Sequence, residues 1–138
     1  MLIGLLVGIA IIAVGSGMDR ALTGTSEQPG GSRLLTTIGN FWLAFILTVV
    51  IAPIIEEIVF RGVLFKSVTS KYGLAAGIVG SSVIFMLVHI HPLQMLSALP
   101  LGVYLAFMYH KLGSIYPGML LHASWNFLIL MIAQSAIS

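Results

Sequence analysis

The sequence predicts an all-α membrane protein, a polytopic bundle of about five transmembrane helices. Of its 138 residues, 59% are hydrophobic and 7% are charged, whereas about 25% are charged in a typical soluble domain. The mean hydropathy is +1.11. Because one span takes about 20 residues, the chain has room for about five spans and for no separate soluble domain. We therefore expect one membrane domain over residues 1–138, divided into a first helix at 1–18, a polar linker at 19–40 and a core at 41–133.

The residue counts exclude several function classes. The chain has no cysteine, which rules out disulfides, thiolate metal sites and a cysteine nucleophile. Its formal net charge is +2, too small to indicate nucleic acid as a partner, and more typical of a few basic residues beside a membrane. Any chemistry must therefore use Glu, His, Asn, Ser or Tyr, and the expected surroundings are lipid.

Residues 2–18 form the first apolar stretch, LIGLLVGIAIIAVGSGM. Gly4 and Gly8 make a GxxxG face of the kind that packs closely against another membrane helix. The alternative is a signal peptide, but no Lys or Arg precedes the apolar core and no A-x-A-like cleavage site follows it. The polar stretch 19–40 contains TGTSEQPGGS, which cannot bury enough apolar surface to fold alone and is expected to be a linker.

The second predicted span, residues 41–65, contains charges where lipid is expected. Glu56, Glu57 and Arg61 lie in this otherwise apolar run, and each ionised side chain at the centre of a membrane helix costs about 2.5 to 3.5 kcal/mol. Pro53 precedes the acidic pair, and a proline inside a helix removes one backbone hydrogen bond and bends the axis. This segment is therefore the leading candidate for a functional site.

Three further spans are predicted after residue 65, at 73–89, 93–109 and 114–133, connected by short turns at 66–72 and 110–113. A helix broken near His91-Pro92 is expected, because the residue before a proline disfavours helical geometry. If this break lies within the membrane, it has to line a wet cavity.

Small residues give two more expectations for these spans. Gly73, Gly77 and Gly80 share one helical face, which predicts tight packing of the third span against a neighbour. Pro100 and Gly102 are expected to interrupt the fourth span.

The distribution of Lys and Arg predicts an orientation. The connections at 66–72 and 110–113 carry lysines and fall on one side, whereas Arg20 and Arg33 fall on the other beside acidic residues. The positive-inside rule places the lysine-bearing side in the cytoplasm. We thus expect an integral membrane protein, in a prokaryotic cell membrane, whose active site opens to the cytoplasmic side.

The spacing of the charged residues indicates different roles for the two glutamates. Glu57 and Arg61 are four residues apart, so they can pair along one helix face. Glu56 projects about 100° away and lacks a local partner. A buried, unpaired carboxylate is a usable general base near neutral pH. The alternative is that both glutamates are polar groups that merely pack helices together.

Two further pairs at helical spacing add candidates from other spans. Phe85 precedes His89 by four residues, and His122 precedes Asn126 by four, so each pair shares one helix face. A lone histidine in a membrane helix more often bonds a neighbouring helix, but three spans that each contribute His or Glu favour a common site. Ser124 lies on another face than His122, and no Asp lies in any span to complete a serine triad.

In this order and on successive apolar segments, these residues resemble the three motifs of the CPBP family. That family groups CAAX prenyl endopeptidases with bacterial proteins of bacteriocin processing and immunity, also called Abi proteins. The resemblance covers residues 40–133 and is carried by Glu56-Glu57-x-x-x-Arg61, Phe85-x-x-x-His89 and His122-x-x-x-Asn126.

The resemblance implies an intramembrane protease and a role for each motif residue. Glu56 would be the base that activates water, His89 would assist it, and His122 and Asn126 would bind the oxyanion. The supporting residues would be Glu57, Arg61 and Phe85. Peptide hydrolysis needs such a base and such donors, and loss of one oxyanion donor typically costs 10² to 10³ in rate.

A metal is the open alternative for the same residues. Glu56, His89 and His122 could hold zinc, since His₂Glu with an open position is a known hydrolytic set. The sequence has no H-E-x-x-H helix, and Asn126 is a poor zinc ligand but a good oxyanion donor. We therefore expect a water activated without an obligatory metal, with a metalloprotease-like zinc site as the rival.

The sequence thus predicts an intramembrane endopeptidase with a peptide or protein substrate, CAAX-like or bacteriocin-like. The rival from another class is a non-catalytic immunity or scaffold protein of the membrane that binds a peptide partner. A third interpretation is an ion or proton path through Glu56 and the histidines. Cleavage that depends on Glu56 selects the enzyme, and protection that survives its replacement selects the binder.

Overall fold

A computed structural model describes residues 38–89 and 92–135 of the chain. In these two ranges every regular element is helical and no strand is present, so the all-α class is confirmed. The expected first helix at 1–18, its rival signal peptide and most of the expected linker lie outside the described residues. The count of five spans accordingly stays a prediction.

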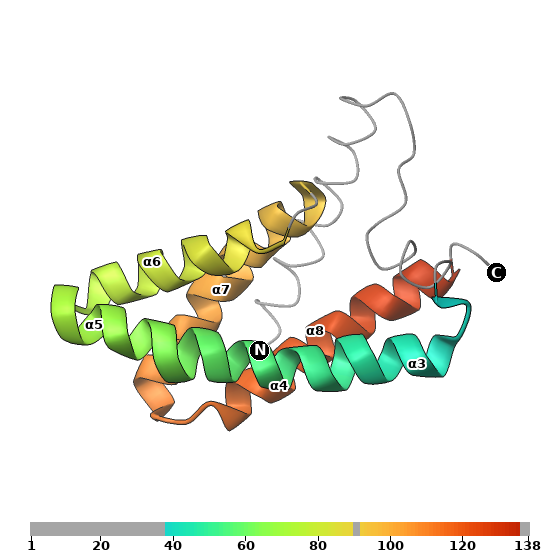
Figure 1. Ribbon diagram of the computed structural model, residues 1–138, viewed down its shortest axis with the longest axis horizontal. Coiled ribbons are helices and arrows are strands. Elements are labelled where there is room, and N and C mark those ends of the chain that lie inside the picture. The colour runs from blue at the N-terminus through green and yellow to red at the C-terminus, as the bar shows by residue number, and fades with distance from the viewer. Residues whose placement is uncertain (1–37, 90–91, 136–138) are drawn as a thin grey trace.

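One long helix, Phe41–Tyr72, organises the fold (Figure 1). Asn40 begins it as N-cap, because its side chain accepts a hydrogen bond from the Leu43 N–H at 3.1 Å. Its consecutive segments are α3 (Phe41–Phe45), η1 (Ile46–Ile51), α4 (Ala52–Glu57), η2 (Ile58–Phe65) and α5 (Lys66–Tyr72). In the η segments the turns are π-helical, a wider form in which N–H groups reach carbonyls five residues back and which is frequent at functional sites.

The connection expected at 66–72 is wrong, because these residues continue the long helix as α5. The hydroxyls of Ser67 and Ser70 bond carbonyls of their own helix, Val63 and Ser67 respectively, so the polar side chains do not stop it. The chain turns instead at Gly73, whose φ of +86° is open to glycine and disfavoured for other residues. The next helix, α6, begins at Leu74 and ends at Leu87, before His89.

Helix α7 (Pro92–Leu112) continues through Pro100 and Gly102, so the expected interruption of the fourth span is wrong. Gly102 serves close packing: a Cβ there would lie 3.2 Å from the Phe85 ring and from Ser82 on α6. The break expected near His91-Pro92 corresponds to the junction of α6 and α7, where residues 90–91 lie outside the described ones. The turn into α8 (Tyr116–Ser135) comes after residue 112, so the basic end of α7 is helical rather than a loop.

The other helices pack against two different halves of the long helix (Figure 1). Helix α8 packs against η1 and α4, whereas α6 packs against α5 and η2, and α7 packs against α6. Gly77 allows the close contact of α6 with α5, since a Cβ there would collide with Thr69. Phe41–Tyr72 and Tyr116–Ser135 are long and apolar enough to cross a membrane.

Candidate active site

The acidic pair lies at the end of α4, between the two π-helical segments and between the two halves of the bundle. Glu57 is fully buried, whereas the Glu56 side chain is 27% exposed. The expectation of a buried Glu56 is therefore only partly right, because α8 covers one side of it. Its Oε2 atom is itself buried and has no hydrogen-bond partner.

Glu57 and Arg61 form the expected pair along the helix. Arg61 Nη1 donates to Glu57 Oε1 at 2.9 Å, and the two side chains are 1% and 0% exposed. The guanidinium also donates from Nη2 to the Gly102 carbonyl of α7 at 3.0 Å and lies over the Phe85 ring, 4.6 Å from its centroid. Arg61 therefore balances the buried charge of Glu57 and connects η2 to α7.

His122 lies between the two carboxylates. Its Nδ1 is 3.3 Å from Glu57 Oε1, and its Nε2 is 3.6 Å from Glu56 Oε2. The ring is almost fully buried. The contact between His122 and Glu57 escaped the sequence analysis, which paired His122 only with residues of its own helix. A carboxylate that accepts a hydrogen bond from one ring nitrogen fixes the orientation of the ring. Here Glu57 is beside Nδ1, so Nε2 is on the side of Glu56.

His89 reaches the same cluster through Phe85. Its Nδ1 is 2.7 Å from the Phe85 carbonyl, and its ring centroid is 4.8 Å from that of Phe85. His122 contacts the same phenyl ring, and the centroids of these two rings are 5.5 Å apart. Since a carbonyl only accepts, the His89 Nδ1 carries the proton, and the Nε2 of the neutral ring is left as an acceptor.

Asn126 bonds the long helix rather than another motif residue. Its Nδ2 donates to the backbone carbonyl of Thr48, in η1, at 2.8 Å. Because an amide nitrogen carries two N–H groups, this bond uses one and leaves the second for another acceptor. Asn126 therefore joins α8 to the first half of the long helix, while His122, one turn earlier, joins it to the acidic pair.

Gly118 is a residue of the site that the sequence analysis missed. A Cβ at this position would lie 2.9 Å from Glu57 Oε2, so any larger residue would require the carboxylate or α8 to move. The signal was present, because Gly118 precedes His122 by four residues and must share its helix face.

The proposed zinc ligands do not form a metal site in this arrangement. Within residues 38–89 and 92–135, no group of three His, Cys, Asp or Glu side chains is placed to hold a metal ion. The physical reason is Phe85: its ring lies against both His89 and His122, and its carbonyl occupies His89 Nδ1. His89 and His122 thus both contact the Phe85 ring, and Glu56 lies near His122, but the three side chains do not converge on one metal position.

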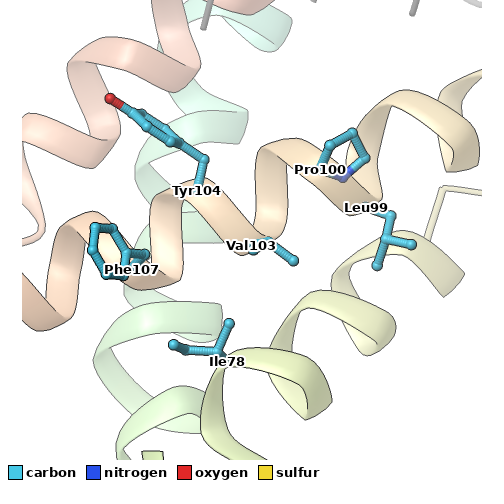
Figure 2. A pocket seen from close by; sticks show the side chains of 6 residues that line it. All are labelled: Ile78, Leu99, Pro100, Val103, Tyr104 and Phe107. Carbon is cyan, nitrogen blue, oxygen red and sulfur yellow. The ribbon is translucent and has the colours of Figure 1, made fainter. Parts of the chain in front are cut away.

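An open apolar groove of about 610 Å³ is lined by none of these polar residues. Figure 2 shows that α7 supplies most of its lining and α6 supplies one residue. The lining residues are Ile78, Leu99, Pro100, Val103, Tyr104 and Phe107. The groove contains no motif residue, so it is distinct from the candidate active site.

A comparison with protein families finds a match that covers most of this region. The model described as Rce1-like, type II CAAX prenyl endopeptidase, matches residues 38–128. This range contains all seven motif residues. The searches of curated proteins and of solved structures return no match.

Proposed function

The chain belongs to the Rce1-like family of type II CAAX prenyl endopeptidases, and from this premise we propose that it hydrolyses a peptide bond of a membrane-associated peptide. The membership confirms the resemblance seen in the sequence and identifies a protease family. The observation that carries the proposal is the cluster in which Glu56 and Glu57 flank the buried His122. A CAAX-like or bacteriocin-like peptide is the substrate class proposed.

In the proposed reaction Glu56 is the general base. Its carboxylate belongs to a side chain that is 27% exposed, so it can accept a proton from a water molecule. The resulting hydroxide attacks the carbonyl carbon of the scissile bond, and the carbonyl oxygen becomes the oxyanion. When the C–N bond breaks, the proton held by Glu56 passes to the leaving amine. A positioned base of this kind typically contributes 10² to 10⁴ in rate.

His89 and His122 have different parts in this scheme. His89, with its proton on Nδ1, presents Nε2 as an acceptor that orients the attacking water. A doubly protonated His122 donates Nδ1–H to Glu57 and turns Nε2–H to the oxyanion, since its 3.6 Å separation from Glu56 is too long for a firm hydrogen bond. The second N–H of Asn126 is the other proposed oxyanion donor.

The scheme needs no obligatory metal, and zinc is its rival. The three residues proposed as ligands have separate parts here: Glu56 takes the proton, His89 orients water and His122 donates. Zinc would need all three as ligands at once. Elemental analysis of the purified protein, with activity before and after a chelator, separates the two. One zinc per chain, with activity lost on removal and restored by zinc alone, would overturn the metal-free scheme.

The proposal includes an orientation. Lys66, at the start of α5, lies beside the basic last turn of α7, because its Nζ is 5.7 Å from the centroid of the Tyr109 ring. The positive-inside rule favours the cytoplasmic side for this end, and hence a site that opens toward the cytoplasm of a prokaryotic cell.

The decisive experiment compares Glu56→Gln with Ser124→Ala in liposomes. The probes are a fluorogenic peptide that ends in a farnesylated CAAX sequence and the same peptide without the farnesyl group. We expect Glu56→Gln to melt like the wild type and to lose at least a hundredfold in cleavage rate. Ser124→Ala is the matched control, since this exposed hydroxyl bonds only Leu120 of its own helix, and it should keep full activity.

Each other result has a meaning. Cleavage retained by a folded Glu56→Gln variant rules out Glu56 as the base. If the wild type cleaves neither peptide but protects cells from a bacteriocin, and protection survives Glu56→Gln, the chain is a binding protein of the immunity class.

A further inference from the structure

The backbone of the long helix has one carbonyl that its own sequence leaves without a donor. In η1 the Ala52 N–H donates to the Leu47 carbonyl, five residues back. The next N–H in this register would serve Thr48, but residue 53 is proline and has none. Thr48 therefore lacks both of its backbone donors, since the N–H four residues ahead is used and the one five residues ahead does not exist.

The side chain of Asn126 occupies this acceptor. Its Nδ2 lies 2.8 Å from the Thr48 oxygen, in a partly buried contact between α8 and η1. A buried carbonyl without a partner is unfavourable, and a donor from another helix removes this penalty. Pro53 and Asn126, 73 positions apart, thus affect the same backbone oxygen. The proline leaves it without an N–H donor, and the asparagine donates to it.

We propose that Pro53 is a positioning residue for the reaction, because it keeps the Thr48 carbonyl free to hold the side-chain amide of Asn126. The inference rests on the proposed function and deepens it. The Thr48 oxygen only accepts, so the amide oxygen of Asn126 is excluded from this side and the amide has a single orientation. Its second N–H is then fixed in direction, and this is the group assigned to the oxyanion.

The proline does not interrupt the helix. The helix is unbroken from Phe41 to Tyr72 (Figure 1), and Pro53 lies inside it at the second position of α4. The proline ring removes one backbone N–H donor from the helix face that carries the Thr48 carbonyl. An alanine at position 53 would supply an N–H that competes with Asn126 for the Thr48 carbonyl, with little change of side-chain volume beyond the lost ring atoms.

The test is a double-mutant cycle on the full chain in liposomes, with kcat, KM and Tm measured for Pro53→Ala, Asn126→Ala and the double variant. Pro53→Ala should lower kcat about tenfold or more and leave KM within about twofold, because an oxyanion donor acts in the transition state. Its Tm should stay near that of the wild type. Asn126→Ala should lower both kcat and Tm, the latter by about 4 °C or more.

The double variant separates positioning from simple packing. The new N–H at position 53 should satisfy Thr48, so the Tm lost in Asn126→Ala should return while kcat remains low. Asn126→Asp gives a second reading, because a carboxylate cannot donate to Thr48: it should lower Tm in the wild-type background and be tolerated with Pro53→Ala. Pro100→Ala, a helix proline in the apolar groove, is the control and should leave kcat unchanged.

A wild-type kcat in Pro53→Ala would overturn the inference, and so would a Tm that is not recovered in both double variants. If Pro53→Ala does not fold, its instability shows that the proline is needed for packing, and the inference is also lost. If the wild type cleaves neither peptide, the proposed function fails, while the Tm cycle still decides whether Pro53 reserves the acceptor for Asn126.

Discussion

The two halves of the long helix hold their neighbours by different means. In the first half a neutral hydrogen bond from Asn126 to the Thr48 carbonyl joins α8 to η1. In the second half a guanidinium, that of Arg61, joins η2 to the Gly102 carbonyl of α7. Both contacts end on a backbone oxygen, but only the second also balances a buried carboxylate.

The buried cores of the two halves also differ in the kind of side chain that they contain. In the first, the buried side chains are aliphatic, namely Ala44, Val49, Leu130 and Ala133, and Phe41 and Phe45 pack against them. The second is aromatic: the Phe60 and Phe85 rings meet edge to face at 5.0 Å, and Phe85 also contacts both histidines and Arg61. In the proposed scheme the first half directs the Asn126 side chain, and the second half holds the buried ion pair of the site.

The largest predicted effect breaks the charged half. Arg61→Ala removes the guanidinium that pairs with the buried Glu57, and breaking such a buried ion pair destabilises a protein by about 3 to 5 kcal/mol. Glu56→Ala should be milder, because Glu56 is partly exposed and Arg61 does not bond it. Thermal melting of both variants in the same detergent makes the comparison. Equal losses would show that Glu57 does not depend on Arg61.

A middle effect is predicted where α8 touches the charged half. Gly118→Ala places a methyl group 2.9 Å from Glu57 Oε2, so the carboxylate or α8 must move, at about 1 to 3 kcal/mol. Gly62→Ala is the control in the long helix: its Cβ would meet only the Glu57 carbonyl at 4.0 Å, and an alanine there should stabilise by about 0.5 to 1 kcal/mol. Similar melting temperatures for the two variants would contradict the close approach at Gly118.

The smallest predicted effect lies at the beginning of the first half. Asn40→Ala removes the side-chain acceptor of the Leu43 N–H, which should cost about 1 kcal/mol. Asn40→Asp keeps the acceptor and should restore the wild-type melting temperature. Cleavage should be unaffected in both, because this cap is far along the helix from the acidic pair; a loss of kcat in Asn40→Ala would mean that the first half does more than direct side chains.

The sequence predicted features that depend on local spacing. The apolar runs and the small charged fraction were sufficient for the helical membrane class, and the spacing of four residues was sufficient for the pair of Glu57 and Arg61. The order of the three motifs was sufficient for the family. Each of these depends on residues close together in the chain or on composition.

Features that depend on which backbone groups remain free were not predicted. The run at 66–72 contains serines and lysines that suit a loop or a helix, and only the turn at Gly73 decides between them. Pro100 suggested an interruption, yet α7 continues through it. The bond of Asn126 to Thr48 requires knowing that Ala52 reaches Leu47, a π-helical register that residue identities do not reveal.

The long helix is also longer than a bilayer is thick. Its 32 residues extend about 48 Å at 1.5 Å per residue, against a hydrocarbon thickness of about 30 Å. Aromatic rings cluster at one end, where Trp42 is 69% exposed, and Lys66 and Lys71 mark the other, the two kinds of residue that anchor helices at opposite interfaces. Tilt can take up part of the mismatch. Glu56 lies ten positions before Lys66, about 15 Å along the axis. In the proposed mechanism the lysine anchor therefore sets how far below one membrane surface a peptide bond must reach. A change in bilayer thickness would alter the tilt of the helix, while this distance along it stays constant.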